Sequence, residues 1–374
     1  MNHSRADRHV PRDFTRPQPY WGKTGHYTIA SFACEQVKPA ALKTLLMANA
    51  DRITVPAGRA AIEGAAAENA PKSHVFVPLA DVPDLVWKNL PTAVKGGRDT
   101  AFRTGPEHPT HYADIDQPLD GTTLRERCVA DPANVSVPVW QDYYTRLGHT
   151  MPDERGLLPF RVWQFFDAMV AAITDKDLAR YVAAAGLLAH YVGDACQPLH
   201  GSYLSDGLPD GTGKGVHSAY ESTMVDRHEA AIVDGIATTI AGAARPSDVT
   251  SGMAAAVGVV ELMDRSATSI APHDLVMSYA AVATKPGDDS VAVTDALWSR
   301  LGERTIGLLV DGTLTLAAIW QSAWAVADGD TVFAGSQLTA IDEHVLQALY
   351  EDQAFVPSLV LDDIGPVLEE KAQG

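Results

Sequence analysis

The chain has 374 residues, 46% hydrophobic and 20% charged, so it can bury a large apolar core. Its formal net charge is -18, and an unassisted surface of that charge repels nucleic acid and anionic membranes. Any chemistry on a phosphate group would therefore need bound metal, which inverts the local charge. Three cysteines, Cys34, Cys128 and Cys196, argue against a disulfide framework, although a single bridge remains open.

The first 20 residues are rich in Arg, Pro and His and are predicted to be flexible. They lack the apolar stretch of a standard secretory signal, so cytoplasmic residence and export by a signal-independent route both remain open. No run of about 18 consecutive apolar residues occurs, so no transmembrane segment is expected. We expect residues 21–374 to form a single catalytic helical domain whose part from about residue 235 is a helical extension. The oligomeric state is not predicted.

Apolar periodicity predicts helices along most of the chain. The first helix begins near Thr24, a good N-cap residue. Further helices are expected over residues 60–70, 156–175, 177–192, 217 to about 234, and 291–327. Gly, Pro and Asp predict long loops over residues 78–120 and 201–215. Period-2 strand patterns are nearly absent, so the predicted fold class is all-α with long functional loops.

One stretch near the middle of the chain, residues 188–200, has the spacing of a metal site. His190 and Asp194 are four residues apart, so on a helix they project from one face. Pro198 ends that helix and lets His200 turn back toward the same face. A histidine and a carboxylate placed in this way can reach into one metal site.

The next predicted helix repeats the pattern with His217 and Glu221. Alone, each pair is more typical of a surface pair or of a supporting hydrogen bond. Here the two pairs lie on either side of His200, which follows Pro198, and of a Gly-rich loop. This combination favours a metal centre.

This stretch resembles the zinc-dependent phospholipase C and single-strand nuclease superfamily. The shared features are a histidine, an Asp four residues later, Gln-Pro, and a histidine six residues after the Asp. Three upstream blocks follow the order of that family: Trp21-Gly22-Lys23-Thr24-Gly25-His26, Val82-Pro83-Asp84-Leu85-Val86 and His111-Tyr112-Ala113-Asp114. The downstream His217-Ser218-Ala219-Tyr220-Glu221, which ends in Glu, is similar to the bacterial phospholipase C branch.

The resemblance implies a multi-helix fold around a cluster of three zinc ions. It assigns Asp84, His111, His190 and Asp194 to the first zinc, His200, His217 and Glu221 to the second, and Trp21, His26 and Asp194 to the third. Asp194 would then bridge two ions. Asp81 is an alternative to Asp84.

The implied activity is zinc-dependent phosphodiester hydrolysis. We expect phospholipase C acting on phospholipid at a membrane or micelle surface, with Asp84, or alternatively Asp114, orienting or deprotonating the attacking water. The alternative is a single-strand-specific endonuclease that releases 5'-phosphate products, in which Tyr112 would stack on a base. A third reading is a helical metal-binding module without catalytic activity.

The Trp21 site carries a further expectation. In the resembling enzymes the free amino group of the first Trp binds zinc, and a peptide nitrogen is a poor ligand because its lone pair is delocalised. Either residues 1–20 are removed, or His9 or Asp13 substitutes.

Overall fold

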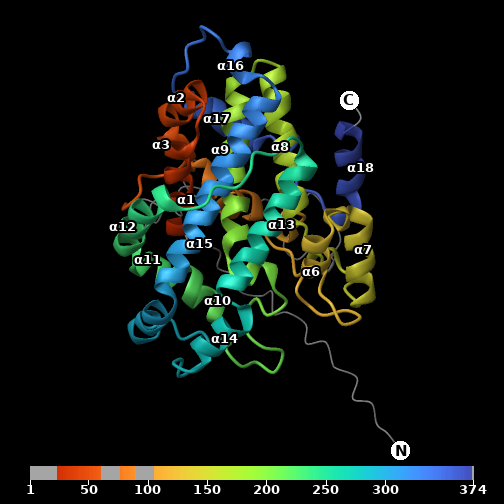
Figure 1. Cartoon of the computed structure of the whole chain (residues 1–374), viewed down its shortest axis with the longest axis vertical. Helices are drawn as coiled ribbons and strands as arrows, with labels where there is room; N and C mark the ends of the chain where they lie inside the picture. The colour runs from red at the N-terminus through yellow and green to blue at the C-terminus, as the bar shows by residue number, and fades with distance from the viewer. Residues whose placement is uncertain (1–22, 60–75, 90–104, 373–374) are drawn as a thin grey trace, which may run out of the picture.

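Helices make up almost all the regular structure of the computed structural model, which describes residues 23–59, 76–89 and 105–372 (Figure 1). Within these ranges, β-type pairing is limited to one isolated antiparallel bridge between Leu119 and Thr122. The predicted all-α class is therefore confirmed. The segment 1–20, Trp21 and the helix predicted over residues 60–70 lie outside the described residues.

Short helices and helical turns occupy the N-terminal part. They are α1 (Lys23–Gln36), α2 (Ala40–Ala48), α3 (Ala50–Ile53), η2 (Leu79–Asp81), α5 (Val82–Leu85), η3 (Trp87–Asn89), η5 (His108–His111), α6 (Leu124–Ala130), η6 (Pro132–Asn134), α7 (Val137–Arg146) and η7 (Pro152–Glu154). The loops predicted over residues 78–120 thus contain several single helical turns.

Longer helices follow. They are α8 (Leu158–Thr174), α9 (Leu178–Cys196), η8 (Pro198–Gly201), α10 (Val216–Ser218), the π-helix η9 (Ala219–Met224), α11 (Val225–Arg227), α12 (Glu229–Thr239), η10 (Ile240–Gly242), α13 (Gly252–Ser269), α14 (Pro272–Ala280), α15 (Val291–Val326), α16 (Gly329–Val332), α17 (Glu343–Glu351) and α18 (Leu361–Ala372).

Helix α9 lies at the centre of the apolar core. Every residue from Tyr181 to Cys196 is buried, as expected of a helix that is apolar on all sides. The Asp177 carboxylate caps its N-terminus by accepting a hydrogen bond from the backbone of Arg180. Helices α1, α8, α13 and α15 all contact it.

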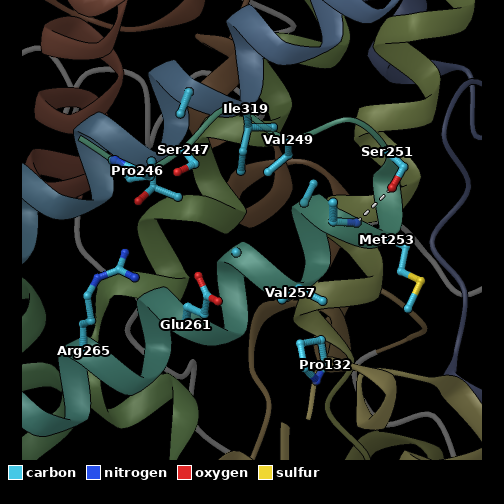
Figure 2. Close-up of a pocket in the computed structure, with 15 residues that line it drawn as sticks. Pro132, Pro246, Ser247, Val249, Ser251, Met253, Val257, Glu261, Arg265 and Ile319 are labelled. Atoms are coloured by element: carbon cyan, nitrogen blue, oxygen red, sulfur yellow. Dashed lines mark hydrogen bonds between the residues drawn. The ribbon is translucent and has the colours of Figure 1, made fainter. Parts of the chain in front are cut away.

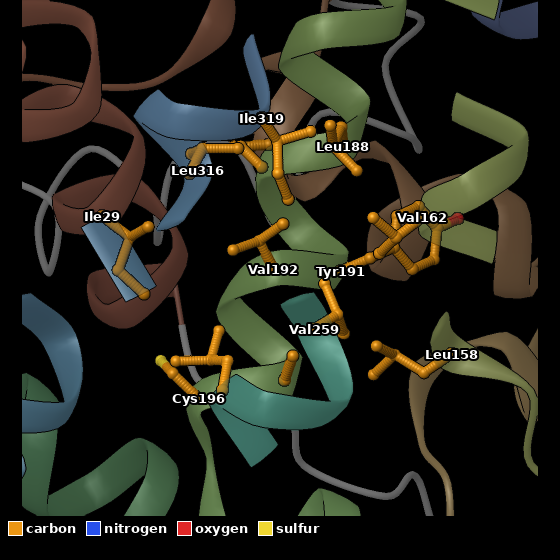
Figure 3. Packing of buried hydrophobic residues seen from close by; sticks show 14 of the residues in the cluster. Ile29, Leu158, Val162, Leu188, Tyr191, Val192, Cys196, Val259, Leu316 and Ile319 are labelled. Carbon is orange, nitrogen blue, oxygen red and sulfur yellow. The ribbon is translucent and has the colours of Figure 1, made fainter. Parts of the chain in front are cut away.

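The packing around α9 is visible in Figure 3, where Leu188 and Val192 lie between side chains of four other helices. These neighbours are Ile29 of α1, Val162 of α8, Val259 of α13 and Leu316 of α15. Full burial of one such aliphatic side chain contributes roughly 1.5–3 kcal/mol. The core therefore holds α9, and any side chains it carries, in a fixed position.

Helix α15 is 36 residues long and is apolar enough, by length and composition, to cross a membrane. However, 83% of its most apolar 18-residue window is buried inside the fold, which is the condition of a core helix. Gly312 permits its close approach to α9, since a Cβ there would lie 2.8 Å from the Cys196 sulfur.

The segment predicted as a helical extension from about residue 235 supplies core helices. Helix α13 packs on α8, and α15 packs on α1 and α9. The Trp320 indole donates a hydrogen bond to the Ala185 carbonyl oxygen at 3.0 Å, and the Tyr181 hydroxyl donates to the Trp320 carbonyl oxygen at 3.0 Å. These bonds tie α15 to α9 along their buried faces.

Two helix predictions differ from the structure. The helix predicted over residues 177–192 continues one turn further, to Cys196, because the chain stays helical until the Gln197–Pro198 step. The helix predicted from residue 217 to about 234 is interrupted, since a π-helix follows Ser218 and the chain leaves helical geometry at His228. The three cysteines are free and buried, so the bridge left open by the sequence is not formed.

Candidate metal centre

Three groups of histidine and carboxylate side chains converge within the described residues. The groups are His26, His190 and Asp194; Asp84, His111 and His190; and His200, His217 and Glu221. In each group, one candidate ligand atom per residue lies within 4.8 Å of the others. His190 belongs to two groups, so these two share one side chain.

The last turns of α9 carry the centre of this cluster. His190 and Asp194 lie one helical turn apart and are both fully buried. The His26 ring of α1 stacks on His190, with ring centroids 3.9 Å apart. Gly193 makes this stack fit, because a Cβ at that position would lie 2.6 Å from His26 Nδ1.

Asp194 faces two of the groups with different oxygens. Its Oδ2 lies 2.9 Å from His111 Nδ1 and 3.5 Å from His190 Nε2, while its Oδ1 lies 3.6 Å from His26 Nε2. Asp84 Oδ1 also lies close to His190 Nε2, at 3.4 Å. This placement suits the predicted bridging role of Asp194, which stays a prediction.

The remaining group forms where α9 ends. Pro198 begins the turn η8, which carries His200, and the π-helix η9 carries Glu221. Glu221 Oε2 lies 3.2 Å from His200 Nε2 and 2.7 Å from His217 Nε2. The Gln197 amide also donates a hydrogen bond to Glu221 Oε2 at 2.6 Å. π-Helical segments of this kind are frequent at functional sites.

Backbone carbonyl groups fix the orientation of three of these imidazole rings. The Nδ1 atoms of His190, His200 and His217 lie 2.7–2.8 Å from the carbonyl oxygens of Ala80, His111 and Ser205. Since a carbonyl oxygen only accepts, each Nδ1 carries the proton and each Nε2 is left as a ligand atom. That is the usual way in which metal-binding histidines are held.

Several polar atoms in the cluster are buried without a hydrogen-bond partner in the part of the chain that the structure describes. They are both ring nitrogens of His26, Asp194 Oδ1 and Glu221 Oε1. Buried polar atoms are rarely left unpaired, because losing water without a replacement costs about 1–3 kcal/mol. Imidazole nitrogens and carboxylate oxygens are zinc ligands, so these residues fit a metal ion.

The charges within the cluster are strongly coupled. Burial alone would lower the pKa of His190, but the carboxylates of Asp194 and Asp84 raise it to about 9. Burial raises the pKa of Asp194 to about 7, against the opposing effect of His190 and His200. Strongly shifted pKa values of this kind cluster at functional sites.

Asp84 behaves differently from Asp194. Burial opposes its ionisation, yet the ammonium group of Lys88, 2.5 Å away, and His190 hold the pKa of Asp84 well below its usual range. Asp84 therefore remains a carboxylate at neutral pH. Its side chain is 14% exposed, more than those of the other candidate ligands.

The other predicted residues are placed as follows. Trp21 lies outside the described residues. Asp81, the alternative to Asp84, is buried in η2 and belongs to none of the three groups. Asp114 is also buried outside them, and the Tyr112 hydroxyl donates a hydrogen bond to the Asp153 carbonyl oxygen. The Tyr112 ring is 7% exposed and packs edge-on against His108, so it does not offer an open face for stacking.

Sequence reasoning missed two charged neighbours of the cluster, Lys88 and Glu107. Lys88 lies four residues after Asp84 and pairs with it. Glu107 lies four residues before His111 and contacts its ring. In both cases the i, i+4 spacing was a usable signal.

A cavity of about 460 Å³ lies elsewhere, beside α13 (Figure 2). Its lining includes Val257, Glu261 and Arg265 of α13 and Ile319 of α15. None of the eight candidate ligands lines it. The cavity therefore does not give access to the cluster.

Comparisons with known proteins give one curated relative, from Bradyrhizobium tropiciagri, which is named a probable serine protease. The two sequences are 38% identical over 392 aligned positions, which cover 93% of this chain and 49% of the relative. The chain thus spans about half the length of the curated relative that it matches. No family model and no solved structure matches the chain.

These findings contradict the resemblance to the phospholipase C and single-strand nuclease superfamily. They also contradict the functions drawn from it, phospholipid hydrolysis and nucleic-acid cleavage, because the relative is named as a protease. The physical reason for the error is that the matching blocks are short and specify a set of ligands. A ligand set does not determine which bond is cleaved, since one type of site serves unrelated chemistries.

Proposed function

We propose that this chain is a metal-dependent hydrolase. The observation that carries the proposal is the convergence, in three groups, of the ligand atoms of eight histidine and carboxylate side chains, all buried except the partly exposed Asp84. Placing so many ionisable groups together without cations would be costly, because each loses its hydration. A hydrolase is also the class that the name of the curated relative suggests.

We expect zinc at these groups, with up to three ions. The groups offer the nitrogen and oxygen ligands of open zinc sites. His190 Nε2 has a single lone pair, so it can serve only one of the two groups that contain His190. When bound, zinc supplies Lewis acidity that lowers the pKa of water toward neutrality. Magnesium and calcium are less suited, because they prefer ligand sets made of oxygen alone.

The chain's own residues would then order the reacting water. Asp84 is ionised, is the most exposed of the candidate ligands, and lies beside Lys88. It is placed to accept a hydrogen bond from a water molecule and to hold its proton. Asp114, buried outside the three groups, has no comparable position.

A peptide is the substrate class that we propose, and it rests on the name of the relative. A peptidase could use these groups directly, or it could use a serine nucleophile, which is the second candidate because the relative is named a serine protease. The relative is about twice as long as the region that this chain matches, so its name can derive from its other half.

The experiment measures metal content and peptide hydrolysis on the same preparation. Elemental analysis should find zinc, and a quenched-fluorescence peptide library should be cleaved until a chelator is added and again after zinc is restored. His190→Ala should abolish cleavage, whereas His344→Ala, which alters an exposed histidine, should not.

The outcomes separate the candidates. Cleavage that resists chelator, together with covalent labelling by a fluorophosphonate probe, would establish the serine nucleophile and overturn the metal-dependent mechanism. Chelator-sensitive hydrolysis of an ester but of no peptide would overturn the substrate class alone. A protein that retains no metal under any loading condition would overturn the proposal.

A further inference from the structure

His111 is held differently from the other histidines of the cluster. Its Nδ1, rather than its Nε2, faces the cluster, at 3.0 Å from His190 Nε2 and 2.9 Å from Asp194 Oδ2. Its Nε2 points outward and lies 3.0 Å from Glu107 Oε1. The orienting partner of this ring is thus a carboxylate, whereas His190, His200 and His217 face backbone carbonyl oxygens.

Glu107 is itself fixed from several sides. Its side chain is 3% exposed, and its Oε1 also accepts hydrogen bonds from the Tyr191 hydroxyl at 2.5 Å and the Thr110 hydroxyl at 3.2 Å. Its Oε2 accepts a hydrogen bond from the Ser358 hydroxyl and lies 3.5 Å from an Arg161 nitrogen. A carboxylate with this many donors has little freedom to rotate away from His111.

Arg161 supplies the compensating positive charge. It is fully buried, and its guanidinium lies 4.6–5.2 Å from the ring centroids of Trp87, Phe165 and Tyr191. It also donates a hydrogen bond to the Pro357 carbonyl oxygen at 2.8 Å. The Glu107 charge is therefore buried next to a cation that is anchored by aromatic faces and by a C-terminal loop.

We propose that Glu107 is a positioning residue that keeps the His111 proton on Nε2, so that Nδ1 is the ligand atom in the group of Asp84, His111 and His190. The proposal deepens the proposed function, since it rests on metal binding at that group. A ring bound through Nδ1 needs an acceptor at Nε2, and a charged acceptor also strengthens the ligand nitrogen.

The test compares zinc binding by wild type and Glu107→Gln, using competition with a chromophoric chelator. An amide is neutral, and it can present either an NH₂ group or an oxygen to Nε2, so it no longer selects one tautomer. We expect one class of sites to bind zinc about 10–100-fold more weakly, while the group of His200, His217 and Glu221 is unchanged. Glu126→Gln, which alters an exposed helix-capping glutamate, is the control and should leave every class unchanged.

A second readout separates positioning from a general loss of stability. In zinc-loaded wild type with ¹⁵N-labelled histidine, His111 should show a protonated Nε2, displaced downfield by its charged acceptor, and an unprotonated Nδ1. In Glu107→Gln the Nε2 proton should move upfield.

Each result decides the proposal. Equal zinc affinity of Glu107→Gln and wild type in every class would overturn the positioning role while leaving the metal centre intact. A proton on His111 Nδ1 in the zinc-loaded protein would also overturn it. Wild type that binds no zinc would overturn the proposed function, and with it this inference.

Discussion

At the scale of single residues, Gly193 is the position where one added methyl group has the clearest consequence. In Gly193→Ala the new Cβ would lie 2.6 Å from His26 Nδ1 and 3.2 Å from its Cε1, so the His26 ring must leave its stack on His190. We expect a loss of about 1–3 kcal/mol in unfolding free energy, as for an overpacked core, together with weaker zinc binding. Thermal unfolding and zinc stoichiometry measure the two effects.

Gly258→Ala is the matched control for that substitution. Gly258 also lies in a helix, but a Cβ there would meet no atom within 4 Å. Alanine should stabilise the protein there by about 0.5–1 kcal/mol, because glycine is a poor helix former. If both variants unfolded like wild type, the tight approach of α1 to α9 would be wrong.

The pH dependence of the metal-free protein is a second residue-scale prediction. The carboxylates around His190 and Glu221 beside His217 raise the pKa of each histidine to about 9, despite burial. Because the folded state holds these protons more tightly than the unfolded state, stability from this source is complete below about pH 6.5 and is lost as pH rises toward 9.

Melting temperatures of chelated protein across that window should therefore fall. Zinc binding should strengthen over the same range, since the metal competes with these protons. A flat melting temperature from pH 6.5 to 9 in chelator would contradict the charge coupling.

The sequence predicted those contacts between side chains that follow from local helical geometry. His190 with Asp194, and His217 with Glu221, are four residues apart on helical segments, so their convergence follows from spacing. The role of Glu107 was not predictable to the same degree. Its contact with His111 has a local signal, but the donors that hold it come from distant parts of the chain.

At the scale of elements, Gln197 links the end of α9 to the π-helix η9. Its amide donates to Glu221, and its side-chain oxygen accepts a hydrogen bond from the backbone of Leu199. Gln197→Leu removes one donor from the buried Glu221 carboxylate and leaves the buried Leu199 backbone N–H without this acceptor. We therefore expect a loss of about 1–3 kcal/mol and weaker zinc binding at Glu221. Chemical denaturation and chelator competition provide the measurements.

Gln347→Leu provides the comparison, because the Gln347 amide donates to Glu351 on the exposed face of α17 at a similar distance, 2.8 Å. That change should be within about 0.5 kcal/mol of wild type. If Gln347→Leu and Gln197→Leu lowered the unfolding free energy equally, the amide–carboxylate contact at Glu221 would contribute no more to stability than an exposed one.

Helix positions were predictable because apolar periodicity is strong in buried helices, and the predicted helix over residues 291–327 matches Val291–Val326 closely. The π-helix was not predictable, since its extra residue per turn leaves the sequence pattern around Glu221 almost unchanged. The interruption at His228 is likewise set by tertiary packing, where its ring stacks on Trp298 of α15.

At the scale of the whole molecule, metal removal should destabilise the fold. An ion that binds only the native state adds stability in proportion to the logarithm of its concentration divided by its dissociation constant. Here the eight side chains that would bind the ions come from many segments of the chain. We expect chelated protein to melt several degrees lower, with recovery on adding zinc but not magnesium. Differential scanning calorimetry measures the shift, and identical melting curves with and without chelator would contradict it.

The activity was the least predictable property of the molecule. The ordered blocks from His26 to Glu221 describe donor atoms, and those donor atoms do converge. The bond that a hydrolase cleaves depends on the surface around its ligands, and the spacing of the ligands in the sequence does not specify that surface. The packing of α13 and α15 in the core was not predictable for a related reason. The apolar pattern of a helix indicates that it is buried, but it does not indicate which helix it packs against.

The contacts around Glu107 also affect the order in which parts of the chain fold during synthesis. The described candidate ligands lie between residues 26 and 221, but Ser358 and the carbonyl oxygen of Pro357 complete the surroundings of Glu107 and Arg161 from far downstream. Closing so long a loop is among the slower events of folding. During synthesis on the ribosome, the nascent chain would thus present metal ligands well before His111 is locked, and an ion captured early would have to exchange or rearrange once the C-terminal residues arrive.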